Sequence, residues 1–257
     1  RHTMKALVSV SDKAGIVNFC RNLVNLGYEI VSTGGTFKVL VENGVKAIPV
    51  EAITEFPEML DNRVKTLHPK IHGGLLSLRE NKEHMATCKE HGIPLIDMVV
   101  VNLYPFEKTI NSKNVTLETA IANIDIGGPS MIRSAAKNYQ SVGVVVNPER
   151  YHTIVEELKN NEGKLSKETK ESLACEAFSH TARYDGIISS YLEKTLMSKK
   201  GLPEFISPNL QKVSDLRYGE NPHQSAAFYK LTETKGLPNL KQHQGKELSY
   251  NNIVDIE

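Results

Sequence analysis

Short, nearly uninterrupted apolar runs alternate with amphipathic segments over the first two thirds of the chain. The apolar runs predict five strands, at 5–10, 28–32, 46–50, 97–103 and 142–146. Between them, apolar residues recur three or four positions apart, which is typical of helices with one buried face. Because strands and helices alternate, and because DMVVVNL (97–103) is apolar on both faces, the pattern predicts an α/β fold with a doubly wound parallel sheet.

The predicted helices follow from the same periodicity. An apolar stripe at 16–24 follows the first strand and closes at Gly27, with Ser11 where an N-cap belongs. The segment RVKTLHPKIHGG (63–74) is predicted to be a loop, because Pro69 argues against an unbroken helix. The remaining helices are predicted at 37–42, 82–91, 117–123, 130–138, 148–160 and 167–197.

The composition of the chain changes after the last of these helices. KKGLPEFISP (199–208) carries one glycine and two prolines and is predicted to be a linker. The residues beyond it show hairpin-like pieces without a closed core of their own. We therefore predict one domain over 4–198 and the incomplete beginning of a second over 199–257. The chain is expected to be a piece of a longer protein, with residues 1–3 left over from cloning.

Composition narrows the class of protein. Of the 257 residues, 40% are apolar and 24% charged, and the net charge is +1. These values indicate a globular protein and give no support for a nucleic-acid or membrane partner. The three cysteines, Cys20, Cys88 and Cys175, have no paired spacing and are expected to be reduced thiols. No stretch has the pattern of a signal peptide or a membrane span, so we expect a cytoplasmic location.

Polar residues gather directly after several predicted strands. Ser11-Asp12-Lys13 follows the first strand, STGGT (32–36) the second, and Asn102 and Tyr104 the fourth. A turn at 124–128 (IDIGG) precedes a helix and adds more polar groups. In an open parallel sheet, ligands bind at the carboxyl ends of the strands, so these segments are expected to converge on one rim.

The STGGT segment suits a phosphate monoester. Its glycines let backbone N–H groups point inward, and the following helix adds the positive end of its dipole. Arg63, Lys65 and Thr66 would add further donors beside it. A tight turn and a solvated basic loop are the structural alternatives for these two segments. The sequence contains neither a Walker motif nor GxGxxG.

Two further groups of residues could carry chemistry. His68 and His72 stand four residues apart, a zinc-ligand spacing on a helix, but Pro69 and the lack of a third ligand favour ordinary histidines. Asp125, Lys137 and Tyr104 could pass protons or stabilise an oxyanion without a metal. For each of those three alone, a salt bridge or an anchored tyrosine is the alternative.

Taken together, these segments resemble a known family. Ser11-Asp12-Lys13, STGGT, RVKTLHPKIHGG, NLYPF, IDIGGPSMIRSAAKN and LRYGENPHQ occur in the order found in PurH, the bifunctional purine-biosynthesis proteins. Those proteins combine AICAR formyltransferase and IMP cyclohydrolase activities. The resemblance implies that residues 4–198 form the cyclohydrolase domain with a methylglyoxal-synthase-like fold. Residues from 199 onward would begin a transformylase domain similar to cytidine deaminases.

The resemblance also implies the reaction and its participants. The substrate would be the nucleotide monophosphate FAICAR, closed with loss of water to IMP in the last step of purine biosynthesis, without metal or cofactor. The full-length transformylase would use 10-formyltetrahydrofolate, and the full-length protein would be a homodimer. Arg217 and Tyr218 match substrate-binding residues of the second domain, but that site would be incomplete, so transformylase activity is expected to be absent.

Site residues carry over from the family motifs position by position. The catalytic residues would be Lys65, Tyr104, Asp125 and Lys137. The substrate-binding residues would be Ser11, Asp12, Lys13, Thr33, Gly34, Gly35, Thr36, Arg63, Thr66, Asn102, Ile126 and Gly127.

The expected mechanism divides the chemistry among these groups. Lys65 and the region of Asn102 would bind the base and polarise the formyl oxygen. Asp125 would receive a proton from the carboxamide nitrogen, directly or through Lys137. Lys137 and Tyr104 would then assist the loss of water.

Two other classes of protein share parts of this pattern. A methylglyoxal synthase has the same fold and a similar phosphate loop, but it would not explain RVKTLHPKIHGG or LRYGENPHQ. A regulatory module, like the effector-binding domain of carbamoyl-phosphate synthetase, needs the phosphate cradle alone. Because one fold hosts many functions, an assay must separate these possibilities.

Overall fold

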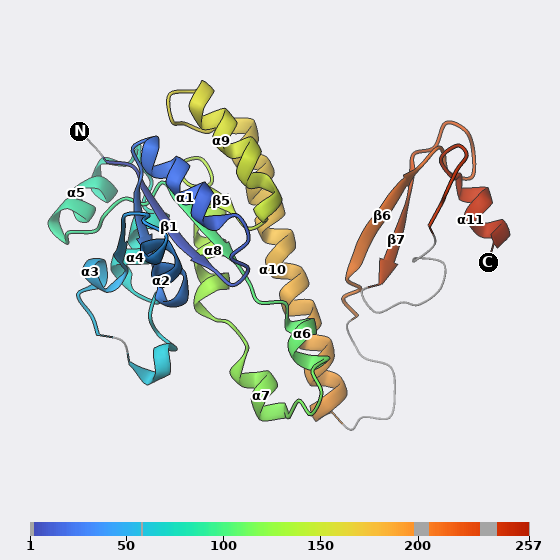
Figure 1. Cartoon of the computed structure of the whole chain (residues 1–257), viewed down its shortest axis with the longest axis horizontal. Coiled ribbons are helices and arrows are strands. Elements are labelled where there is room, and N and C mark those ends of the chain that lie inside the picture. Colours follow the sequence, from blue (N-terminus) through green and yellow to red (C-terminus); the bar gives the residue numbers. More distant parts are fainter. Residues whose placement is uncertain (1–2, 58, 198–205, 232–240, 257) are drawn as a thin grey trace. The chain divides into compact units, whose positions relative to one another are not determined.

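The computed structural model describes residues 3–57, 59–197, 206–231 and 241–256. The chain divides into two compact units, one ending at Ile188 and the other beginning at Ser189 (Figure 1). This division falls inside a long helix, and each unit is described separately. The domain boundary predicted after residue 198 and most of the predicted linker lie outside the described residues.

The first unit is built on the five predicted strands. They form one sheet with the order β3-β2-β1-β4-β5, and every neighbouring pair is parallel. All five residues of β4 are buried, as its unbroken apolar run predicts. The strands are β1 (Lys5–Val10), β2 (Glu29–Ser32), β3 (Ala47–Pro49), β4 (Met98–Asn102) and β5 (Gly143–Val145).

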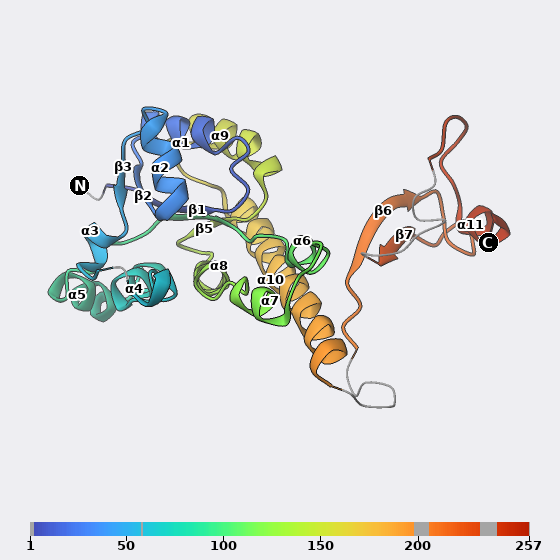
Figure 2. The ribbon, with the colours of Figure 1, turned by 60° about the horizontal axis from the view of Figure 1, so that its bottom comes forward.

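Helices cover both faces of this sheet, which confirms the doubly wound α/β prediction. Figure 2 shows α1 (Ile16–Asn25), α2 (Gly34–Glu42) and α9 (Tyr151–Asn160) on one face. The other face carries α4 (Pro69–Leu76), α5 (Lys82–Glu90), α8 (Gly127–Lys137) and α10 (Lys167–Leu196). Shorter elements are α3 (Glu51–Thr54), η1 (Leu60–Asn62), α6 (Phe106–Ile110), α7 (Leu117–Ala122) and η2 (Pro148–Arg150).

The predicted start of the first helix is wrong. Helix α1 begins at Ile16, and Gly15 occupies the N-cap position with a left-handed backbone (φ 70°) and no side-chain cap. The backbone N–H of Ser11 instead donates to the Oδ1 atom of Asn102. Ser11 therefore belongs to a loop that is held by β4, and Gly15 redirects the chain into the helix.

The loop predicted over residues 63–74 is also partly wrong, because α4 begins inside it. Pro69 occupies the first turn of α4. Backbone N–H groups in that turn make no intrahelical hydrogen bond, so a proline there costs the helix none. His68 is the N-cap, and its Nδ1 atom accepts a hydrogen bond from the N–H of Lys70 at 3.1 Å. Pro69 therefore starts this helix instead of excluding one.

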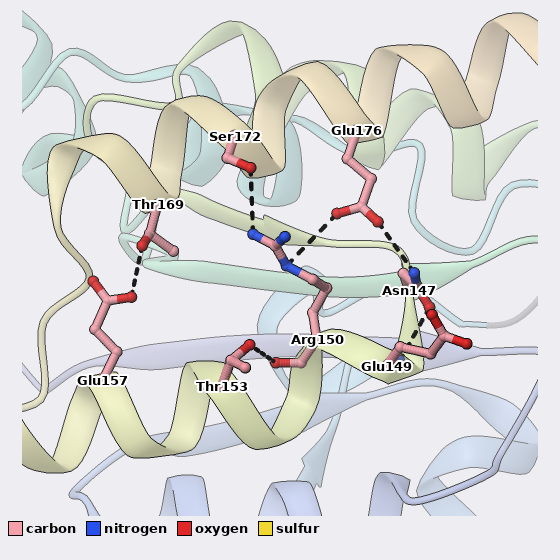
Figure 3. A network of polar contacts seen from close by, with 8 residues as sticks. All are labelled: Asn147, Glu149, Arg150, Thr153, Glu157, Thr169, Ser172 and Glu176. Carbon is pink, nitrogen blue, oxygen red and sulfur yellow. Dashed lines mark hydrogen bonds and ion pairs between the residues drawn. The ribbon is translucent and has the colours of Figure 1, made fainter. Parts of the chain in front are cut away.

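A polar network fixes the first half of α10 against α9 and the segment before it (Figure 3). The guanidinium of Arg150 lies 3.8 Å from the carboxylate of Glu176, which also accepts from Asn147 at 3.2 Å. Two turns earlier on α10, Thr169 donates to Glu157 at 2.6 Å. Because these contacts lie at different positions along α10, they fix the position of the helix along its axis.

The second unit contains a hairpin and a short helix. Strands β6 (Leu210–Leu216) and β7 (Ala226–Leu231) pair antiparallel, which confirms the predicted hairpin-like pieces, and α11 (Tyr250–Ile256) follows. Across the described segments of both units, no helix combines the length and the apolar character that crossing a membrane requires.

We predict that Gly74→Ala destabilises the chain, whereas Gly73→Ala does not. A Cβ atom on Gly74 would lie 2.2 Å from the carbonyl oxygen of Pro94, whereas on Gly73 it would meet the flexible side chain of Ile93 at 3.1 Å. Overpacking against backbone should lower the free energy of unfolding by about 2 kcal/mol or more. For Gly73→Ala, the gain in helix propensity of about 1 kcal/mol offsets the crowding.

Urea denaturation of both variants and the unsubstituted chain measures this difference. Equal midpoints for the two variants would show that α4 does not pack against the Pro94 carbonyl as closely as described.

Candidate active site

A polar pocket lies where the strand order of the sheet reverses, between β1 and β4. This switch point is where open α/β sheets bind ligands. The pocket volume of about 510 Å³ is in the range of small-molecule sites. Its lining includes most of the predicted site residues, namely Ser11, Lys13, Thr33, Gly34, Gly35, Thr36, Arg63, Lys65, Thr66, Asn102, Tyr104, Asp125, Ile126 and Gly127.

The pocket also contains residues that the sequence interpretation missed. They are Ser9, Val10, Asp61, Val101, Ala122, Asn123 and Met131, whereas Ile124 and Gly128 belong to the 124–128 turn that was expected at this rim. Ser9 could have been found, because a polar residue near the end of a buried strand faces the same rim as the loop that follows. Val10 and Val101 lie at the ends of β1 and β4. Ala122 and Met131 belong to α7 and α8, and Asp61 belongs to η1, so the packing of these elements and not a local polar motif brings them to the pocket.

Asn102 holds the loop that follows β1. Its Oδ1 atom accepts from the N–H groups of Ser11 at 2.7 Å and Asp12 at 2.8 Å, and its Nδ2 atom donates to the Asp12 carbonyl at 3.0 Å. The residue is buried. These three bonds engage both polar atoms of the Asn102 side chain, so its observed role is to hold the pocket wall. The predicted contact of the Asn102 region with a base stays a prediction.

The hydroxyl groups near the start of α2 are also engaged with the protein. The Thr36 hydroxyl exchanges hydrogen bonds of 3.1 Å with the N–H and carbonyl of Val10, and the Thr33 hydroxyl lies 2.7 Å from that of Ser9. Both threonines are buried. They join α2 to β1, and the donors best placed for a ligand are therefore the backbone N–H groups in the first turn of α2.

Two ammonium groups stand beside this first turn. The Nζ atom of Lys65 lies 3.4 Å from the point where a Cβ on Gly34 would be, and that of Lys13 lies 3.9 Å from the equivalent point on Gly35. Gly34 has a left-handed backbone (φ 44°). Gly34 thus provides the backbone conformation of a helix N-terminus beside which two cations lie. The arrangement suits a dianionic group such as a phosphate monoester.

Lys65 is held on its other side by a carboxylate. Its Nζ atom lies 3.8 Å from Oε1 of Glu51, and the lysine side chain is only 14% exposed. The preceding loop bends through Leu60 and Asp61, both with left-handed backbones (φ 51° and 54°). Such conformations cost energy in residues with a Cβ and persist where the surroundings impose them. The bend brings Arg63 and Lys65 to the pocket.

Asp125 lies at the start of α8, across the pocket from α2. Its Oδ1 atom accepts from the N–H of Gly128 at 3.0 Å. A Cβ on Gly128 would fall 2.3 Å from the other carboxylate oxygen of Asp125, and one on Gly127 would fall 2.6 Å from the Thr66 hydroxyl. The second glycine pair is therefore required for Asp125 and Thr66 to pack against the helix start.

Burial raises the pKa of the Asp125 carboxyl above its ordinary value, and the hydrogen bond from Gly128 opposes part of this increase. By surface area Asp125 is an exposed residue of the pocket, and its carboxylate oxygens lie close to the backbone of Gly128. A carboxylate whose pKa is raised is a stronger proton acceptor than an ordinary one.

Tyr104 and Ile126 complete the rim and are about half exposed. Lys137, by contrast, is not among the residues that line this pocket. It sits in the last turn of α8 and lines a separate groove with Arg133 and Phe178. Ten positions along a helix correspond to about 15 Å, so the predicted proton relay between Lys137 and Asp125 is not assembled within the described chain. The catalytic role of Lys137 stays a prediction.

The histidines and the second-unit residues lie elsewhere. The Nδ1 atom of His72 is 2.9 Å from the Ser134 hydroxyl, while His68 caps α4. Within the described segments, no three His, Cys, Asp or Glu side chains gather as a metal site would require. Arg217 and Tyr218 follow β6, and the Arg217 guanidinium stacks 5.3 Å from the Tyr218 ring centre.

The raised pKa of Asp125 predicts how stability depends on pH. Because the folded chain binds this proton more tightly than the unfolded chain, the Asp125 contribution to stability falls as pH rises from the ordinary aspartate range through the raised pKa. Asp125→Asn lacks this titration and can still accept from Gly128. The variant should therefore gain stability relative to the unsubstituted chain as pH rises through this window.

Urea denaturation of both proteins at a series of pH values tests this. A stability difference that stays constant from pH 4 to pH 8, or that moves in the opposite direction, would show that the Asp125 pKa is not raised.

Comparison with known proteins identifies the family of this chain. A model of the MGS-like domain matches residues 15–130, and a model of the AICARFT/IMPCHase bienzyme matches residues 135–257. The chain is 56% identical over 254 residues to the bifunctional purine biosynthesis protein PurH of Thermoanaerobacter sp. (strain X514), and 51% identical over 259 residues to that of Polynucleobacter necessarius subsp. necessarius (strain STIR1). Each match covers 98% of this chain and 49% of the relative.

A solved structure shows the same fold. The crystal structure of ForH matches with a TM-score of 0.65 and 31% identity, over 74% of this chain and 98% of that one. The chain spans about half the length of the curated relatives it matches. The methylglyoxal-synthase-like fold and the family resemblance predicted from the sequence are confirmed. The chain belongs to the PurH family of bifunctional purine-biosynthesis proteins and corresponds to the N-terminal portion of its members.

Proposed function

We propose that this chain is an IMP cyclohydrolase that closes FAICAR to IMP with loss of water. The observation that carries the proposal is the composition of one pocket. A helix start flanked by Lys13 and Lys65 stands in the same pocket as Asp125, whose pKa is raised. Family membership supports the assignment, because the relatives are bifunctional purine-biosynthesis proteins. A module that only binds a nucleotide has no need of Asp125 in that position.

Binding in this proposal begins with the phosphate. The first turn of α2 supplies backbone N–H groups at Gly34 and Gly35, and Lys13 supplies a positive charge. With the phosphate fixed, the base extends across the pocket toward Asp125 and Tyr104. Holding two reacting groups in contact removes an entropic barrier that can reach about 7–11 kcal/mol in favourable cases.

The chemical step then requires proton transfers. The carboxamide nitrogen bonds to the formyl carbon and gives one proton to Asp125, whose raised pKa suits a general base. The formyl oxygen becomes negative in this step, and the Lys65 ammonium stabilises it. Asp125 returns its proton to that oxygen, and the resulting hydroxyl takes a second proton and leaves as water while the formamido nitrogen gives its own proton back to the second donor. The Tyr104 phenol is the proton donor that we assign to this departure.

The proposed ring closure is separate from formyl transfer. Arg217 and Tyr218, which were matched to formyl transfer, belong to the second unit. Ring closure needs no folate, because it has no net redox change and moves no one-carbon unit between molecules.

The test is conversion of FAICAR to IMP, followed by ultraviolet absorbance without folate. Lys65→Met should lower kcat about a hundredfold, the range found when one donor to an oxyanion is removed. Lys38→Met is the matched control, since Lys38 lies on α2 with an exposed side chain paired to Glu42. Its kcat should equal that of the unsubstituted chain.

Other outcomes separate the competing classes. IMP binding without turnover would favour a regulatory nucleotide-binding module, and formation of methylglyoxal from a triose phosphate would favour the lyase. Lys137→Ala tests the remaining prediction. Loss of cyclisation with phosphate binding intact would support a role for Lys137, whereas an unchanged rate would remove it from the mechanism.

A further inference from the structure

Helix α10 contacts both segments that carry the proposed proton chemistry. The hydroxyl oxygen of Tyr184 accepts a hydrogen bond of 2.8 Å from the backbone N–H of Asp125. The preceding residue, Arg183, donates to the carboxylate of Glu107 at 2.8 Å. Glu107 belongs to α6, which begins two residues after Tyr104 and runs beside α10 in Figures 1 and 2. Two consecutive residues of α10 therefore touch the Tyr104 segment and the Asp125 turn.

The helix that presents Tyr184 is itself firmly placed. The network of Figure 3 ties Glu176 to Arg150 and Asn147, two turns before Tyr184. Tyr184 is buried, with 6% of its surface exposed. A buried phenol on an anchored helix has little freedom to move, so its hydroxyl is a fixed point against which the neighbouring turn is held.

The Asp125 turn is held at two points. Tyr184 binds the backbone N–H of Asp125, and the N–H of Gly128 binds its carboxylate. Asp125 precedes α8, so its own N–H lies outside the ladder of that helix. With the backbone fixed on one side and the carboxylate on the other, the carboxyl group keeps a single orientation toward the pocket.

We propose that Tyr184 is a positioning residue for the cyclisation, orienting Asp125 through its backbone N–H. The inference rests on the proposed function. Tyr184 is absent from the residues that line the pocket, so it acts on Asp125 and not on the substrate. A tyrosine that only filled space would be replaced by phenylalanine without consequence, because the two side chains differ by the hydroxyl group alone.

The same contact maintains the environment that raises the Asp125 pKa. Burial is the largest cause of that increase, so loosening the turn and admitting water should lower the pKa toward its ordinary value. Burial also raises the pKa of Tyr184 itself, which keeps its phenol protonated at neutral pH. The other ionisable groups around the pocket are Lys13, Asp61, Arg63, Lys65 and Tyr104.

The experiment compares Tyr184→Phe with a matched control, Tyr28→Phe, in the full 257-residue chain. Tyr28 is also buried, and its hydroxyl donates to the Gly163 carbonyl at 3.1 Å, but it does not line the pocket. Each variant loses one buried hydroxyl contact. Tyr184→Phe should lower kcat about tenfold with little change in KM, the scale expected when a buried N–H loses its partner.

The pH profile separates positioning from general destabilisation. In Tyr184→Phe, the acidic limb of kcat should move to lower pH, whereas Tyr28→Phe should keep both the kcat and the limb of the unsubstituted chain. Equal kcat values and equal acidic limbs in the two variants would overturn the proposal.

A second readout does not depend on turnover. Titration of the Asp125 carboxyl by carbon-13 NMR should give a lower pKa in Tyr184→Phe than in the unsubstituted chain, and an unchanged value in Tyr28→Phe. If the unsubstituted chain produces no IMP, the proposed function fails, while the titration still decides whether Tyr184 positions Asp125. An Asp125 pKa unaltered by Tyr184→Phe would overturn the inference.

Discussion

The parallel pairing of β1 with β4 is the contact on which the site depends. Their register places Val10 opposite Asn102, so the two strands end at the same level. Beyond that level, the Asn102 side chain continues the hydrogen bonding that the backbone ladder can no longer supply, and it holds the N–H groups of Ser11 and Asp12. The order of the sheet reverses at this pair, which opens a crevice between the connections that leave in opposite directions.

Both helices that border the crevice begin with a pair of glycines. At the start of α2, Gly34 adopts a left-handed backbone, and the ammonium groups of Lys13 and Lys65 lie beside the pair. At the start of α8, the missing side chains leave room for the Thr66 hydroxyl and the Asp125 carboxylate. Side chains on the α8 pair would collide with both of these groups, so the close contact at that helix terminus requires glycine. The result is a cationic side and an acidic side within one pocket.

The concentration of charge in the pocket is a local property, since the chain as a whole carries a net charge of only +1. Glu51 balances Lys65 on the side away from α2, and both side chains are partly shielded from solvent. Asp125 stands in surroundings crowded enough to raise its pKa. Its orientation depends on α10, which is tied to α9 by a network far from the pocket (Figure 3). The chemistry of the rim therefore relies on helix packing outside the pocket.

The local sequence was sufficient to predict the strands and most of the long helices, because the spacing of apolar residues indicates which face of an element is buried. It also placed the loops after β1, β2 and β4 on one rim, since parallel strands end on the same side. The helix at Pro69–Leu76 was missed because proline, which breaks a helix in its interior, is tolerated in the first turn. The start of α1 was mispredicted because Gly15, with a left-handed backbone, occupies the N-cap position in place of Ser11.

The sequence by itself determined the class of fold, the family resemblance and the cluster of residues that gather around the pocket. Only the tertiary structure decided what each of them does there. It engaged Asn102, Thr33 and Thr36 in holding the pocket wall, and it placed Lys137 at the far end of α8. It also brought Tyr184 to Asp125 across 59 positions of sequence. Hydrogen-bond partners of this kind are set by how helices pack in three dimensions, and neither composition nor periodicity records that packing.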